Sequence, residues 1–232
     1  MANLPKHHSL KAILLVFFLL GNLMGCAPST TESGTAPTET KNESPAAVTS
    51  APTPPDWQEI LGAGVSLSLP ASYEGGNPGK EIDTLGEKLG EIKPEYSDRV
   101  EPIKQRTKAI VFLAFDPKNA EQGTITNVSV IKEELPEDQE IQEIIDSAAK
   151  KISLVYKLVN QETVTINGEK VGKINAQANS EGTLMQVLLY LVPREETLWV
   201  VSYTTTAEEF KERSPDFEKS IRTFSVAKES NS

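Results

Sequence analysis

Apolar residues are spread unevenly along this chain and divide it into three parts. Residues 12–20 form one unbroken apolar run with the sequence AILLVFFLL. A polar stretch rich in Ser, Thr, Pro and Glu follows, with almost no large apolar residue. Farther on, apolar residues recur with the periods of strands and helices. We therefore predict a targeting segment at residues 1–25, a linker at 26–55 and one folded domain at 56–227.

Several segments of the predicted domain have the pattern of β-strands. Val65, Leu67 and Leu69 alternate with serines and stop at Pro70, which indicates a strand. The other predicted strands are 109–115, 124–131, 163–166, 170–178, 183–192 and 198–203. The dipeptide Asn167-Gly168 between two of them is a strong hairpin signal, and the last two strands are predicted to form a second hairpin.

Two further segments have helical spacing. Residues 141–155 carry apolar side chains on one face, and Asp138 is the predicted N-cap. Residues 81–106 have a weaker helical pattern that Gly86, Gly90 and two prolines interrupt. We predict one or two short helices there.

A last helix is predicted to begin at a capping box, in which Thr206 and Glu209 satisfy each other's free amides, and to restart at Ser214-Pro215. The hairpins make the sheet mainly antiparallel. Strands that are apolar on both faces need cover on both sides, which the long helix and the last helix can supply. The expected fold is therefore of the α+β class, a three-layer α/β/α sandwich.

Cys26 is the single cysteine of the chain and stands where the predicted signal ends. Together with Leu23, Met24 and Gly25, it resembles the bacterial lipobox, in which the cysteine thiol receives a diacylglycerol and the signal is cut just before it. Two or more buried acyl chains hold a protein stably on a membrane. We predict lipidation of Cys26 on the extracytoplasmic face of a bacterial membrane, in the periplasm, the cell envelope or a thylakoid lumen. A soluble secreted protein is the alternative.

The charge of the chain limits its partners. There are 23 basic and 33 acidic residues, which gives a formal net charge of −10. Loss of Lys6 and Lys11 with the signal leaves 21 basic against 33 acidic residues, or −12. Because an acidic surface repels phosphate groups, we expect no nucleic-acid partner.

Both histidines, His7 and His8, lie in the predicted signal, so the mature chain would have none. Its one thiol would carry lipid and could form no disulfide within the chain. The sequence therefore excludes Ser-His-Asp and Cys-His catalysis and the usual Cys/His zinc sites. We expect no catalytic residue and no cofactor.

Three short motifs approach known signatures without matching them. Ser147 and Lys150 have the Ser-x-x-Lys spacing of serine acyl-transferases but fall in the middle of a predicted helix. Residues 75–80 (GGNPGK) are one residue short of a phosphate-binding loop and are predicted to form a turn. Residues 62–64 (GAG) precede a strand rather than a helix, which argues against dinucleotide binding.

Two acidic groups could bind calcium, although neither has EF-hand spacing, and a solvated loop is the alternative. The first group is Asp116, Asn119 and Glu121, and the second is Glu133, Glu134, Glu137, Asp138 and Glu140. A pair of carboxylates could also form a hydrolase site, but such partners meet only in the folded chain. Four aromatic residues could line a groove, and core packing is the favoured interpretation for them: Trp57, Tyr190, Trp199 and Tyr203.

The order of the predicted elements resembles the PsbP-like fold. The matching stretches are residues 64–70 (GVSLSLP), 164–168 (VTING), 199–203 (WVVSY) and 220–226 (SIRTFSV). Photosystem II proteins of the lumen, a yeast Ran-binding import factor and several bacterial lipoproteins share this fold. The resemblance implies a non-enzymatic accessory or assembly role, which in cyanobacteria would be beside a photosystem.

We therefore predict a membrane-anchored lipoprotein that binds a protein partner of a photosynthetic or other membrane complex. The expected contact surface is the sheet edge and the loops after Pro70 and Pro193. A lipoprotein that binds calcium or a small molecule is the first alternative, and a carboxylate-based hydrolase is the second.

Overall fold

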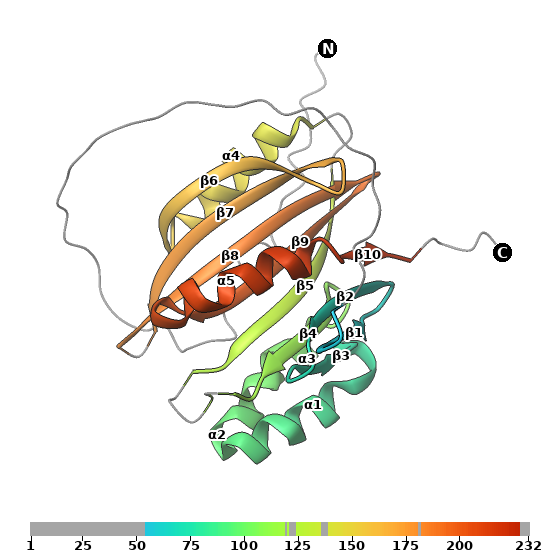
Figure 1. Cartoon of the computed structure of the whole chain (residues 1–232), viewed down its shortest axis with the longest axis vertical. Helices are drawn as coiled ribbons and strands as arrows, with labels where there is room; N and C mark the ends of the chain where they lie inside the picture. Colours follow the sequence, from blue (N-terminus) through green and yellow to red (C-terminus); the bar gives the residue numbers. More distant parts are fainter. Residues whose placement is uncertain (1–53, 119, 121–123, 136–138, 181, 228–232) are drawn as a thin grey trace, which may run out of the picture.

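The computed structural model describes residues 54–118, 120, 124–135, 139–180 and 182–227. These residues form two antiparallel sheets and several helices (Figure 1). The strands are β1 (Trp57–Leu61), β2 (Val65–Pro70), β3 (Glu74–Gly76), β4 (Ile110–Asp116), β5 (Thr126–Glu134), β6 (Lys157–Ile166), β7 (Glu169–Ser180), β8 (Thr183–Arg194), β9 (Thr197–Thr206) and β10 (Ser225–Val226). The helices are α1 (Pro78–Ile92), α2 (Pro94–Ser97), the 3-10 turn η2 (Asp98–Val100), α3 (Glu101–Lys104), α4 (Ile141–Ile152) and α5 (Ala207–Ile221).

The larger sheet has the strand order β3-β4-β5-β9-β8-β7-β6. Both predicted hairpins are confirmed. Asn167 and Gly168 join β6 to β7 with φ angles of 51° and 83°, values that fit the mirror-image turns of tight hairpins. The second hairpin joins β8 to β9 through Glu195 and Glu196. The smaller sheet has the order β1-β2-β10, and its outer strands were not predicted.

Buried apolar side chains form two clusters, one on each face of the larger sheet. One cluster joins α4 and α1–α3 to the sheet and includes Ile145 and Leu89. The other joins α5 and the smaller sheet to the opposite face and includes Phe217 and Leu67. The predicted three-layer α/β/α arrangement is thus confirmed, with the smaller sheet added to the layer of α5. No helix within the described ranges is long and apolar enough to cross a membrane.

The predicted break of the first helix at its glycines is wrong, because α1 is one continuous helix. It begins earlier than expected, since Asn77 caps it through a hydrogen bond of 2.9 Å that the amide of Gly79 donates to Oδ1. The segment 75–80, predicted as a turn, therefore ends β3 and starts α1. Gly86 faces Val100, whose Cγ2 would lie 3.0 Å from an added Cβ, so the glycine allows close packing.

Gly90 in α1 gives a prediction about stability. Replacing it with alanine is expected to raise the free energy of unfolding by about 0.5–1 kcal/mol, because alanine loses less backbone entropy in a helix. The nearest atom to the new methyl group would be Cβ of Ser97, at 3.4 Å, an ordinary contact. Urea denaturation measures the change. Gly86→Ala is the matched control and should gain less or lose stability; a larger gain there would contradict the packing explanation.

The two remaining helices also differ from their predictions in detail. α4 has Glu140 as its N-cap, and the expected cap, Asp138, lies outside the described residues. The predicted restart at Ser214-Pro215 is wrong, because α5 runs unbroken through Pro215. A proline removes one helical hydrogen bond. The freed carbonyl of Lys211 lies 3.5 Å from the hydroxyl of Ser214, which donates to it.

Candidate functional site

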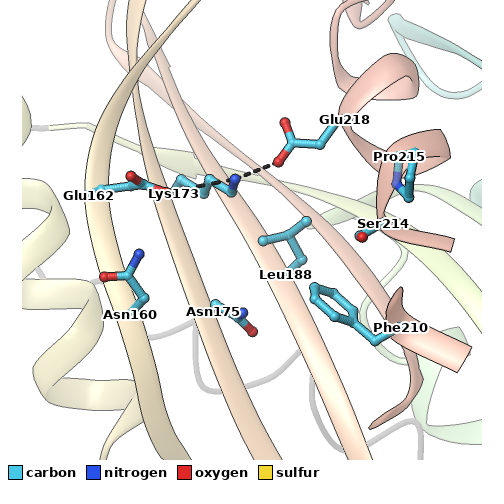
Figure 2. Close-up of a pocket in the computed structure, with 9 residues that line it drawn as sticks. All are labelled: Asn160, Glu162, Lys173, Asn175, Leu188, Phe210, Ser214, Pro215 and Glu218. Carbon is cyan, nitrogen blue, oxygen red and sulfur yellow. Dashed lines mark hydrogen bonds and ion pairs between the residues drawn. The ribbon is translucent and has the colours of Figure 1, made fainter. Parts of the chain in front are cut away.

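A cleft lies between α5 and the outer strands of the larger sheet. α5 packs against β8, β9 and β2, and β6 and β7 extend beyond it (Figure 1). The cleft has a volume of about 320 Å³. Figure 2 shows the residues that line it: Asn160, Glu162, Lys173, Asn175, Leu188, Phe210, Ser214, Pro215 and Glu218.

A β-bulge decides which side chains of β6 face the cleft. Leu158 pairs with Ala176 and Asn160 pairs with Asn175, so Val159 between them has no partner residue on β7. The extra residue shifts the alternation of side chains along the strand. As a result, Leu158 packs into the core on the α4 side of the sheet, whereas Asn160 and Glu162 line the cleft on the other side.

The helical wall of the cleft is one stripe of α5. Phe210, Ser214 and Glu218 follow each other at intervals of four residues, which places them on the same face of the helix. Figure 2 shows this stripe opposite the side chains of β6, β7 and β8. Phe210 and Leu188 give the cleft an apolar part between its polar ends.

Charge in the cleft is concentrated around Lys173. Its Nζ contacts a carboxylate oxygen of Glu218 and lies 3.7 Å from Oε1 of Glu162 (Figure 2). Tyr190 is the residue directly opposite Lys173 on β8, and its buried hydroxyl lies beside Glu218. Burial, and after it the negative charge of Glu218, raise the pKa of this hydroxyl. Two carboxylates against one ammonium leave the cleft with an excess negative charge.

A row of side-chain amides continues the polar surface along the sheet. Nε2 of Gln186 donates a hydrogen bond to Oδ1 of Asn175, and Nε2 of Gln177 donates to Oε1 of Gln186 over 2.7 Å. These bonds fix the orientation of the amides. They leave Nδ2 of Asn175 without a partner in the described part of the chain, and this group can donate to a ligand.

A second, mostly buried polar network lies on another face of α5, beside β4, β5 and β9. Arg213 donates from Nη1 to Oδ2 of Asp116 and from Nε to Oε2 of Glu209, each over 2.7 Å. The hydroxyls of Thr126 and Thr205 lie 2.8 Å apart and also reach Glu209. Burial, the largest single influence, lowers the pKa of Arg213, but the hydrogen bonds with Asp116 and Glu209 and the charges of Tyr73 and Glu209 together outweigh it, and the pKa is raised.

This network bears on two sequence-based interpretations. Asp116 was a candidate calcium ligand, but its carboxylate is occupied by Arg213 and by the amide of Lys118. Its proposed companions Asn119 and Glu121 lie outside the described residues. Thr206 caps α5 as the capping box predicts, since the amide of Glu209 donates to its Oγ1 over 3.1 Å, and the Glu209 carboxylate also takes part in the buried network.

The described residues of the second acidic group do not share one environment. Glu133 is buried, Glu134 and Glu140 are exposed, and residues 137 and 138 lie outside the described ranges. Across the described residues, no three His, Cys, Asp or Glu side chains come together as a metal site.

The other candidate residues occupy structural positions. Ser147 and Lys150 lie within α4, with Lys150 exposed. Gly62 makes a close backbone approach, since an added Cβ would lie 2.5 Å from the carbonyl of Val111. The prediction of core packing for the four aromatic residues is confirmed, as each is at least nine-tenths buried: Trp57, Tyr190, Trp199 and Tyr203.

The loops predicted as contact surface are small in the structure. Pro193 lies inside β8, and Tyr73, shortly after Pro70, is buried. The residues of the cleft were not predicted. One signal for them is present in the sequence: Lys173, Asn175 and Gln177 alternate on one face of a strand whose other face is apolar.

No protein-family description and no curated protein matches this chain. Among solved structures, it is similar to the cyanobacterial PsbP of Synechocystis sp. (12% identity, 74% of this chain and 92% of that chain, TM-score 0.48). It is also similar to LpqN of Mycobacterium tuberculosis, described as involved in cell envelope biogenesis (9% identity, 74% and 90%, TM-score 0.48). A third match is the Ran-binding protein Mog1p of Saccharomyces cerevisiae (10% identity, 70% and 90%, TM-score 0.43). With TM-scores below 0.5 and identities of 12% or less, these matches are overall likenesses, and no residue role is carried over from them.

Proposed function

We propose that the chain is a non-enzymatic, lipid-anchored accessory protein on the extracytoplasmic face of a bacterial membrane, and that its cleft binds a protein partner. The cleft beside β6 is the observation that supports binding, because it combines an apolar floor with amide and charged groups that can orient a ligand. The motif that ends at Cys26 supports the anchor. A photosynthetic or other membrane complex would supply the partner.

The arrangement of charges in the cleft argues against the hydrolase alternative. A glycosidase needs open space between its two carboxylates, where the scissile bond lies. Here the ammonium of Lys173 occupies that space, since it contacts Glu218 and lies 3.7 Å from Glu162. Ser214 also faces the cleft, but a serine nucleophile requires an adjacent base, and the mature chain would have no histidine.

Site-specific crosslinking in native membranes tests the proposed function. A photoreactive amino acid at Asn160, which is exposed at the rim of the cleft, is expected to capture a defined protein that mass spectrometry can identify. The same amino acid at Glu59, exposed on β1, is the matched control. Equal, background-level products from both positions would contradict a binding role for the cleft.

A further inference from the structure

The cleft opens directly onto a free strand edge. β6 is the last strand of the larger sheet and pairs with β7 on one side. In the described part of the chain, no backbone group outside the sheet hydrogen bonds with β6. Its outward N–H and C=O groups are therefore available to another strand.

The edge is little protected against such pairing. Proteins commonly block an edge strand with proline, charged residues or a bulge. β6 has no proline, its Lys157 and its bulge at Val159 lie near its start, and Glu162 is the single charged residue between Asn160 and Ile166. From Asn160 to Ile166, the register with β7 is regular. This part of the strand can hydrogen bond continuously with an added chain.

The register decides which side chains an added strand would meet. Alternate residues of a neighbouring strand point to the same face of the sheet. On the face of α5, they would lie beside Asn160 and Glu162, at the mouth of the cleft. Extended main chain along β6 and a side chain in the cleft can thus be bound at the same time.

The charges favour a basic side chain in this position. The side chain of Glu162 is 45% exposed, and its ion pair with Lys173 is long, at 3.7 Å. Lys173 makes its close contact with Glu218 instead. Glu162 is thus left with charge that an incoming cation can neutralise, and the formal net charge of −10 attracts basic partners as a whole.

We propose that β6 accepts an extended, basic segment of a partner protein as an additional strand, with an Arg or Lys side chain that enters the cleft beside Glu162. The aliphatic part of this side chain would contact Leu188 and Phe210, and the partner's main chain would pair with β6. The inference rests on the proposed function and specifies the chemistry of the partner segment.

A display library of random twelve-residue peptides, selected on the purified full chain, tests the proposal. The recovered peptides are expected to lack proline and to carry Arg or Lys at alternate positions. A synthetic copy of a recovered peptide should slow the amide hydrogen exchange of residues 160–166 and leave β1 unchanged. Recovery of no peptide, of peptides without basic residues, or of peptides that do not protect β6 would overturn the proposal.

Matched variants test the role of charge. Glu162→Lys should weaken binding of the synthetic peptide by about tenfold or more, because like charges would then face each other, and Glu162→Gln should have a smaller effect. Glu59→Lys makes the same charge change on an exposed edge strand of the smaller sheet and should leave the affinity within about twofold. Equal binding to Glu162→Lys and Glu59→Lys would contradict a basic side chain in the cleft.

The outcomes separate this inference from the proposed function. A partner captured through Asn160 that binds without protecting β6 would keep the accessory role and overturn strand addition. Basic peptides could also bind selectively to β6 while crosslinking captures no partner. That result would support the addition of a basic strand to β6 and contradict the proposed protein partner in that membrane.

Discussion

Replacement of Arg213 with methionine is expected to lower the free energy of unfolding by about 3–5 kcal/mol, the usual cost of leaving a buried charge without its partner. Asp116 is 2% exposed and receives its hydrogen bond from Arg213 over 2.7 Å. Without the guanidinium, the carboxylates of Asp116 and Glu209 would remain close together in a desolvated region. Methionine keeps much of the side-chain volume, so the loss of stability measures the effect of removing the positive charge. Urea denaturation followed by tryptophan fluorescence measures it.

Two further variants test whether burial of the ion pair explains the size of this loss of stability. Lys88→Met breaks an ion pair with Glu74 of 2.8 Å in which the two side chains are 44% and 40% exposed. This change should cost about 0–1 kcal/mol, as exposed pairs generally do. Adding Asp116→Asn to the Arg213 variant should recover part of the loss, since it removes the unpaired charge. Similar losses for Lys88→Met and Arg213→Met would refute the explanation.

Replacement of Cys26 with serine is expected to abolish acylation of the chain. The wild-type chain should be recovered without residues 1–25 and with the added mass of acyl chains on Cys26, whereas the variant should carry no acyl mass. Each buried CH₂ contributes about 0.8 kcal/mol to membrane binding, so loss of the chains removes the anchor. Mass spectrometry of the N-terminal peptide and incorporation of labelled palmitate measure the effect.

The single thiol of the chain offers a control for this experiment. Adding Ser29→Cys to the Cys26→Ser variant restores one thiol three residues farther on, outside the motif. It should not be acylated. Acylation at position 29, or a wild-type chain that retains residues 1–25 without acyl mass, would show that the motif does not direct lipidation.

Local signals were sufficient to predict most of the larger sheet. The turn at Asn167-Gly168 and the apolar strand Ile110–Asp116 depend on nearby residues, and both were recognised. The errors occur where contacts between residues far apart in the sequence determine the local structure. Gly86 was predicted to break α1, but the glycine lets the helix pack on Val100. Ser225 and Val226 form a strand only because Ser66 and Val65 lie beside them.

The candidate site was harder to predict because its parts come from separate elements. Lys173 is 45 residues from Glu218 in sequence, and no local pattern connects them. The alternation of polar residues along β7 was visible, but it did not show that α5 would leave this strand uncovered. The bulge that turns Leu158 away from the cleft has no sequence signature of its own here.

The bulge at Val159 makes the chemistry of the cleft depend on strand length. Loss of Val159 would remove the bulge and leave Leu158 and Asn160 on opposite faces, as they are now. Loss of Gln161 would instead place Val159 opposite Asn175, so that an aliphatic side chain would lie where the cleft now begins. Every other strand would keep its register. A single-residue insertion or deletion in β6 is therefore an evolutionary route by which this scaffold could change its ligand preference without a new core.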